Sequence, residues 1–297
     1  MRQSTILIII GFILLWNSGF IGAEYGLPHT GPFTLVFWRY LGLSLLMALY
    51  LFFRNKFKWY GFKVAFLNMF IGFLAHGVWL TCVLFALDNN VPAGIVALIV
   101  ALQPLTTGAS AYFVTGETTN LYQWFGLILG FIGVALSIGF RIDFEDSSSI
   151  FGYFIPLGSV IAITIATLIQ RKMEINREKE KLPLDQTIFY QSIATALALA
   201  LPAILVEDLK TDWVPEFNYT LLWLILAVSL GAYILMWQLI ERLDTTKVAS
   251  LFYLGPPITM LMAWIAFGDK VKLMDIVGMG VVFIGVFLTQ LKKDKRY

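Results

Sequence analysis

The sequence predicts an all-α membrane protein with ten transmembrane helices in two inverted five-helix repeats. Three observations lead to this prediction: the composition, a series of ten apolar runs, and a repeat between the two halves of the chain. Of the 297 residues, 59% are hydrophobic and only 13% are charged, whereas soluble domains carry about 25% charged residues. The chain therefore has too few charges to cover a water-facing surface, which excludes a soluble globular protein.

Ten apolar runs follow one another, and each is about as long as a helix that spans a bilayer, which needs roughly 20 residues. They cover about residues 5–22, 33–53, 62–87, 91–114, 121–140, 150–170, 184–206, 219–240, 248–267 and 273–291. The connections are mostly short, which leaves no room for a separate catalytic domain. We interpret the first run as a retained helix and not a cleaved signal segment, because its removal would leave an odd number of helices.

The positions of the Lys and Arg side chains predict the orientation, because cytoplasmic loops are enriched in both. If the N-terminus lies inside, the outer segments hold only Arg141, Lys210, Lys270 and Lys272, and nearly all the other basic residues lie in inner segments. We therefore expect a multi-pass protein of the cell (inner) membrane with both termini in the cytoplasm. The net charge of +2 gives no indication of a nucleic-acid partner.

A repeat at an offset of 152 residues relates the two halves, which we place at residues 1–145 and 146–297. The offset superimposes Pro104 on Pro256, Gly116 on Gly268, Glu117 on Asp269, Gly126 on Gly278, and Gly133 on Gly285. Because five helices per half is an odd number, the second copy must enter the membrane from the opposite side. Such inverted repeats occur in many secondary transporters, where the two halves can interconvert inward-open and outward-open states.

Several short motifs occur along the chain: residues 15–20 (LWNSGF), Trp38-Arg39-Tyr40, Leu102-Gln103-Pro104-Leu105, Gly116-Glu117, Gly255-Pro256 and Gly268-Asp269. These motifs resemble those of the drug/metabolite transporter superfamily, in its EamA-type branch with ten helices. Asp269 is a mild departure, since the family often has glutamate there. The resemblance covers nearly the whole chain and implies export or exchange of small metabolites, with a central site near helices one, three, four, six, eight and nine. It does not identify the substrate.

Pro104 and Pro256 occupy equivalent positions inside two apolar runs, where each removes one backbone hydrogen bond. We interpret them as paired kinks that act as hinges or line a cavity, and a bend set only by packing is the alternative. Small residues, among them Gly126, Gly130 and Gly133, form a stripe on the fifth run that favours close helix packing. We expect the fourth and fifth helices, and likewise the ninth and tenth, to form scaffold hairpins.

Arg39 is the only basic residue well inside an apolar run, and a charge near the centre of a membrane helix is costly. Glu24, at the outer end of the first run, is its expected partner and a candidate outer gate. The pair would bind or gate a substrate that carries a carboxylate. A purely structural ion pair, or an arginine that extends towards the interface, is the equally supported alternative.

A further set of polar and aromatic side chains lies in the apolar runs and is predicted to turn towards a cavity. The candidates for this cavity are Asn17, Ser18, His76, Trp79, Gln103, Gln191, Trp237 and Tyr253. His76 and Trp79 are three residues apart and should share a helix face. Singly, each of these side chains is better explained by bonds between helices. Together they indicate an uncharged, amide-rich and partly aromatic cavity.

These features predict a secondary transporter of a small neutral or zwitterionic metabolite, such as an amino acid, by alternating access. No acidic residue lies deep in an apolar run, so a proton relay through a carboxylate is poorly supported. A carrier for drugs or other amphipathic compounds is the alternative, and a membrane-embedded enzyme or a channel would be a different class. With two His and one Cys, we expect no metal or cofactor. The expected partners are the substrate and the bilayer, with a monomer favoured.

Overall fold

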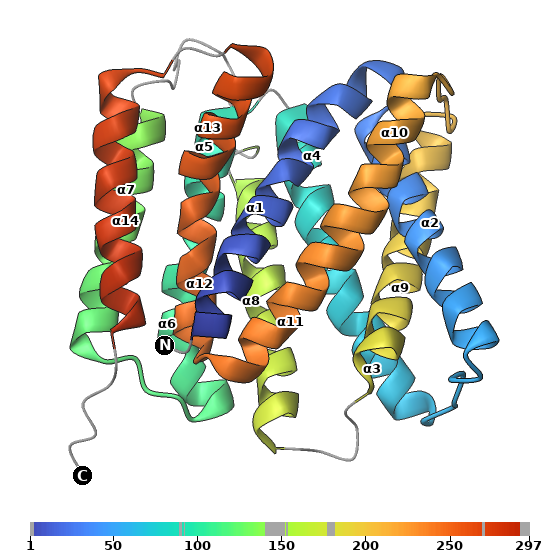
Figure 1. Cartoon of the computed structure of the whole chain (residues 1–297), viewed down its shortest axis with the longest axis horizontal. Helices are drawn as coiled ribbons and strands as arrows, with labels where there is room; N and C mark the ends of the chain where they lie inside the picture. The colour runs from blue at the N-terminus through green and yellow to red at the C-terminus, as the bar shows by residue number, and fades with distance from the viewer. Residues whose placement is uncertain are drawn as a thin grey trace.

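The computed structural model describes residues 3–88, 91, 93–139, 152, 154–176, 182–268 and 271–291. Within these ranges the chain is helical and contains no strand, only an isolated bridge between Thr30 and Thr211. The helices stand side by side in one layered bundle (Figure 1). The predicted fold class is confirmed. Asp269, and the expected boundary between residues 145 and 146, lie outside the described residues.

Among the described residues, eight helical stretches are long and apolar enough to cross a membrane. They are Ser4–His29, Pro32–Phe53, Phe62–Ala86, Ile155–Ile175, Leu184–Leu205, Pro215–Arg242, Thr245–Phe267 and Leu273–Gln290. A shorter apolar helix covers Leu121–Ser137. The remaining predicted span, at about residues 91–114, is divided into α5 (Ala93–Val100) and α6 (Gln103–Thr115).

The helices of the second half begin at positions equivalent to those of the first. The pairs are α1 (Gln3–Gly26) with α8 (Ile155–Asn176), α2 (Pro32–Phe53) with α9 (Leu184–Leu205), and α7 (Leu121–Gly139) with α14 (Leu273–Gln290). In each pair the first residues differ by the same 152 positions that the sequence repeat predicts. The side-chain patterns of the two halves therefore encode the same series of helix starts.

The third and eighth spans share an unusual local structure. In the third span, α3 (Phe62–Gly72) and α4 (Trp79–Asp88) flank the π-helical segment η2 (Phe73–Val78). In the eighth, α10 (Pro215–Trp223) and α11 (Tyr233–Arg242) flank the π-helical segment η4 (Leu224–Ala232). The repeat offset of 152 residues places the equivalent of η2 within η4. π-Helical turns of this kind are rare and are frequent at functional sites.

The fourth and ninth spans are broken where the sequence predicts kinks. In the ninth span, α12 (Thr245–Leu251) and the 3-10 turn η5 (Phe252–Leu254) precede α13 (Gly255–Phe267). Pro104 and Pro256 each lie in the first turn of a new helix, α6 or α13, and not inside a continuous one. The structure corrects the prediction in this respect, because a first turn needs no N–H from proline.

The two broken spans also end alike. Gly116 closes α6 and Gly268 closes α13, with φ of 73° and 72°. This left-handed conformation is the common C-terminal cap of a helix, and glycine adopts it without steric cost.

Helices from opposite halves pack together at both edges of the bundle: α2 lies along α9, and α7 lies along α14 (Figure 1). Between α7 and α14 the backbones touch, because a Cβ added at Gly126 would lie 2.5 Å from the Gly285 carbonyl oxygen. A Cβ added at Gly133 would lie 2.8 Å from the Gly278 carbonyl oxygen. The repeat offset of 152 residues relates Gly126 to Gly278 and Gly133 to Gly285, so the two contacts are equivalent. The small-residue stripe of the fifth helix therefore packs against the tenth helix, a partner that the sequence did not name.

The bundle has two ends, which we name after their position in Figure 1. The lower end carries the loops 54–61, 116–120 and 243–244, and the upper end carries the loops 27–31 and 206–214. The first turn of α1 and the last turn of α14 both point towards the lower end. At the upper end, the carboxylate of Glu207 accepts hydrogen bonds from the backbone N–H groups of Phe33 and Thr34. This carboxylate caps the start of α2.

The glycine contacts between α7 and α14 predict a position-specific effect of a single methyl group. We expect Gly285→Ala to lower the melting temperature of the detergent-purified protein, because its Cβ would lie 2.5 Å from the Gly130 nitrogen. Overpacking of this kind costs about 1–3 kcal/mol. Gly280→Ala on the same helix is the matched control, since no atom lies within 4 Å of its added Cβ. Equal melting temperatures for the two variants would contradict the packing.

Candidate functional site

A buried cluster of polar aromatic rings joins the two halves in the middle of the bundle. His76 lies on the π-helical segment η2, and its Nδ1 forms a 2.7 Å hydrogen bond with the hydroxyl of Tyr233 on α11. The Tyr233 hydroxyl also bonds to that of Tyr40 on α2, at 3.0 Å. The Tyr40 ring stacks on the imidazole, with centroids 5.4 Å apart. All three side chains are buried, so each hydrogen bond compensates for lost contact with water.

Arg39 adjoins this cluster, and it does not pair with Glu24 as the sequence led us to expect. Its Nε donates a 2.5 Å hydrogen bond to Ser229 on η4, and its guanidinium carbon lies 5.5 Å from the centre of the Tyr40 ring. Glu24 is exposed at the upper end of α1. The cause is the packing of α2 against η4. Gly42 of α2 leaves room for the Ile225 side chain of η4, and this close packing brings Arg39 to Ser229.

Gln191, on α9, approaches the same cluster from the other side. Its side chain lies beside His76, and its backbone passes so close to α3 that a Cβ added at Gly72 would lie 2.4 Å from the Gln191 Cα. The Nε2 of Gln191 is buried and finds no hydrogen-bond partner among the described residues. The Nε2 of Gln103, at the start of α6, is in the same situation. Buried donors without an acceptor are costly, which is typical of groups that bind a ligand or water.

Two predicted residues of α1 bond to different neighbours. Asn17 donates to the Ile13 carbonyl at 2.7 Å and accepts from the Thr259 hydroxyl at 3.2 Å. It therefore connects α1 to α13 just beyond the break at Pro256. The Ser18 hydroxyl accepts a 3.1 Å hydrogen bond from the indole N–H of Trp223 on α10. Both contacts join the first helix to the second half.

Among the described residues, three other candidates form no hydrogen bond with the central cluster, although Trp237 and Tyr253 belong to the same apolar core as Tyr40 and Tyr233. Trp79 packs with Ala75 and α8 residues such as Ala166, because the π-helical turn before it changes the spacing that would place it on the face of His76. Trp237 lines a small cavity of about 40 Å³ near the lower end. Tyr253 packs over Gly130 of α7. The last two keep a buried polar atom without a partner.

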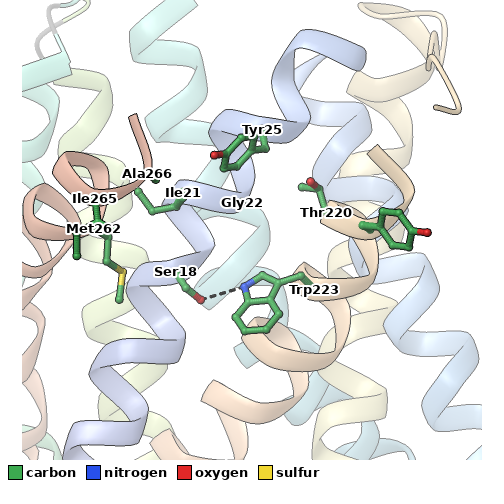
Figure 2. A pocket seen from close by; sticks show the side chains of 10 residues that line it. Ser18, Ile21, Gly22, Tyr25, Thr220, Trp223, Met262, Ile265 and Ala266 are labelled. Carbon is green, nitrogen blue, oxygen red and sulfur yellow. Dashed lines mark hydrogen bonds between the residues drawn. The ribbon is translucent and has the colours of Figure 1, made fainter. Parts of the chain in front are cut away.

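A larger crevice lies in the upper half between α1, α10 and α13, with a volume of about 460 Å³. Figure 2 shows the hydrogen bond between Ser18 and Trp223 on one side of it, and Met262 and Ile265 on the opposite side. Tyr25 lies nearer the upper end. Its walls are almost entirely apolar and aromatic. Its volume is within the range of pockets that hold small molecules.

The lower end is tied together by a charged network that crosses between the halves. Glu117, just after α6, pairs with Arg171 of α8 at 2.6 Å. The same carboxylate accepts hydrogen bonds from the backbone N–H and the hydroxyl of Thr245, at 2.9 and 2.6 Å. Arg171 also donates to the Ile240 carbonyl oxygen. Burial opposes ionisation of the carboxyl group, but the hydrogen bonds from Arg171 and Thr245 outweigh it and lower the pKa of Glu117.

Sequence reasoning missed several members of these clusters. Ser229 and Tyr233 lie four residues apart in an apolar run, a spacing that marks a polar helix face and could have revealed them. Arg171 counted only as a cytoplasmic loop charge. In the described ranges, no three His, Cys, Asp or Glu side chains come together as metal ligands would.

The family model for EamA-like transporters matches residues 3–139 and 150–291. The chain belongs to the EamA-like transporter family. This EamA protein is 24% identical to an uncharacterized transporter of Archaeoglobus fulgidus, over 99% of this chain and all of that one. It is 22% identical to a probable amino-acid metabolite efflux pump of Salmonella typhimurium, over 93% of this chain and 91% of the relative.

A solved crystal structure of a protein superimposes on this EamA chain with a TM-score of 0.80, over 98% of this chain and 97% of the other. The two sequences are 19% identical, so the likeness shows the fold alone. The fold, the family and the apolar helices together make the chain an integral membrane transporter.

The lowered pKa of Glu117 predicts how acid affects stability. A carboxylate with a depressed pKa stabilises the folded state fully above its ordinary value of 4.5, and this contribution is lost as the pH falls through the lowered value. We expect Glu117→Gln to lower the melting temperature at pH 7. Between pH 5 and pH 3, the melting temperature of this variant should fall less than that of the unmodified protein. Asp208→Asn, at an exposed carboxylate of the upper end, is the control and should leave both unchanged. An identical acid response in Glu117→Gln would contradict this role of the network.

Proposed function

We propose that this EamA transporter exports or exchanges a small neutral or zwitterionic metabolite, such as an amino acid, by alternating access. The observation that carries the proposal is the difference between the two ends of the bundle. The lower end is closed by the network of Glu117, Arg171 and Thr245, and its cavity holds only about 40 Å³. The upper half contains the crevice of about 460 Å³. We interpret this difference as one state of an alternating carrier, with the lower end closed and the upper end open.

The broken spans supply the hinges in this proposal. Pro104 and Pro256 start new helices at equivalent points of the two halves, so each break lets one part of a span tilt against the other. Because the two halves, 1–145 and 146–297, are inverted copies, the opposite state is obtained when they exchange conformations. In that state the network at Glu117 opens and the upper crevice closes.

The central cluster is the proposed substrate site. It presents the rings of Tyr40, His76 and Tyr233, the charge of Arg39 and the amide of Gln191. Tyrosine and amide groups can bind both the polar and the apolar part of an amphipathic metabolite. The efflux-pump relative named above is consistent with an amino acid. The apolar walls of the upper crevice favour the second candidate, a carrier for drugs or other amphipathic compounds.

We further propose that the protein has no enzymatic activity, cofactor or nucleic-acid partner. It would work as a monomer in the cell (inner) membrane. The distribution of basic residues supports cytoplasmic termini, which would place the lower end in the cytoplasm. A channel would need both ends open at once. A membrane-embedded enzyme would need reactive groups around a bound substrate.

Transport by the purified protein in liposomes tests the substrate class. We expect saturable counterflow of at least one radiolabelled amino acid, and inhibition by an excess of the same unlabelled compound. Amphipathic drugs are tested in parallel as competitors. Absence of any saturable transport of amino acids or of amphipathic drugs would contradict the proposal.

A reversible disulfide at the lower end tests alternating access. The hydroxyl oxygens of Thr119 and Thr246 lie 3.1 Å apart, which suits a disulfide after replacement of both by cysteine. In a Cys82→Ala background, we expect oxidation of Thr119→Cys/Thr246→Cys to abolish transport and reduction to restore it, because the closed end cannot open. The two single-cysteine variants control for the substitutions. Transport that continues at full rate in the cross-linked protein would rule out opening at this end.

A further inference from the structure

Arg39 carries a positive charge inside the bundle, and no carboxylate among the described residues pairs with it. Of its nitrogen atoms, Nε bonds to the neutral hydroxyl of Ser229, and no hydrogen bond of the described residues reaches Nη1 or Nη2. Within the part of the chain that the structure describes, the ion pairs join Lys56 with Asp185, Glu117 with Arg171, and Asp244 with Lys247. Charges inside membrane helices are expensive and are usually paired. The guanidinium therefore lacks the counter-ion that its position calls for.

Gln191 presents a second donor without an acceptor at the related position of the other half. It lies 152 residues after Arg39, so the repeat exchanges the two, and their helices α2 and α9 pack along each other. The Gln191 side chain is 3% exposed and its Nε2 has no partner. Gln191 lies beside the His76 ring, and the Arg39 guanidinium lies over the Tyr40 ring that stacks on it. The Nδ1 of His76 is already bonded to Tyr233. Two sets of unused N–H donors thus border one cluster.

We propose that Arg39 and Gln191 bind a carboxylate group of the transported molecule. The inference rests on the proposed transport function and narrows the substrate class to molecules with a carboxylate group, such as zwitterionic amino acids. A guanidinium presents parallel N–H donors whose spacing matches the two oxygens of a carboxylate. The amide N–H of Gln191 supplies a further donor. A phosphate, with its higher charge, fits less well, because Arg39 is the single Lys or Arg within the described apolar spans away from their ends.

The test compares acids with their uncharged or amide counterparts on the full-length protein in detergent. The probes are acetate and acetamide, 3-phenylpropionate and 3-phenylpropionamide, and L-phenylalanine and L-phenylalaninamide. Binding constants at pH 7 come from the rise of the melting temperature with probe concentration. We expect at least one acid to bind about 10- to 100-fold more tightly than its amide, the size of effect that one charge-assisted hydrogen bond produces.

Two substitutions assign this preference to the site. Arg39→Gln should remove the preference for the acid, whereas Lys58→Gln, which removes an exposed positive charge in the loop 54–61, should keep it. Gln191→Leu should weaken binding of the acid by about three- to tenfold, as loss of one neutral hydrogen bond does. If Arg39→Gln does not fold, the comparison of acids with amides in the unmodified protein and in Gln191→Leu still tests whether the site binds a carboxylate.

Three results would overturn the inference: no acid binds the unmodified protein, the amides bind as tightly as the acids, or the preference survives in Arg39→Gln. These failures are distinct from failure of the proposed function. A protein that transports amphipathic amines or neutral compounds in liposomes, yet shows no preference for acids, keeps its transport function and loses this site. A protein that binds acids but moves nothing across the liposome membrane keeps the site and loses the transport function.

Discussion

Backbone contact between the two inverted halves, at Gly126–Gly285 and Gly133–Gly278, holds the α7 and α14 edge of the bundle together. In a bilayer, apolar side chains gain little by leaving lipid for protein, so helices associate through close packing and hydrogen bonds. Glycine allows the closest packing, and the repeat places it on both helices at matching positions. The opposite edge, where α2 lies along α9, is formed by the same pair of halves (Figure 1). With both edges shared, the remaining spans enclose a centre to which both halves contribute.

That centre combines features that lipid alone would disfavour. The π-helical segments η2 and η4 occur at related positions, and so do the breaks before α6 and α13. The segment η2 carries His76, and Tyr233, which bonds to it, directly follows η4. Irregular backbone is tolerated in membrane proteins where it is buried in protein or lines a cavity. The irregularity and the polar cluster therefore have one explanation: a site for a polar molecule between two halves that move. The network at Glu117 closes one end of that site.

The sequence was sufficient for the fold, because membrane spans leave a strong signal and the repeat constrains their arrangement. It predicted the two proline positions and the importance of the glycines of α7, but not that α7 packs on α14, since a stripe of small residues does not name its partner. For the site, Arg39, His76 and Gln191 were all among the predicted residues, but Arg39 was expected beside Glu24 and not beside the Tyr40 and His76 rings. The pairing of Arg39 with Ser229 depends on the packing of α2 against the π-helical segment η4, and the position of Trp79 depends on the π-helical segment η2. No local sequence rule identified these segments.

The most direct test of the account measures both ends of the bundle in the same protein. Spin labels at Phe113 and Arg242 report on the lower end, and labels at Tyr219 and Ile265 report on the upper end, with distances measured in lipid nanodiscs. The account predicts that the two distances change in opposite directions, and that Glu117→Gln shifts the populations towards a wider lower end and a narrower upper end. Both ends widening together, or a lower end that never opens in the presence of a transported compound, would contradict it.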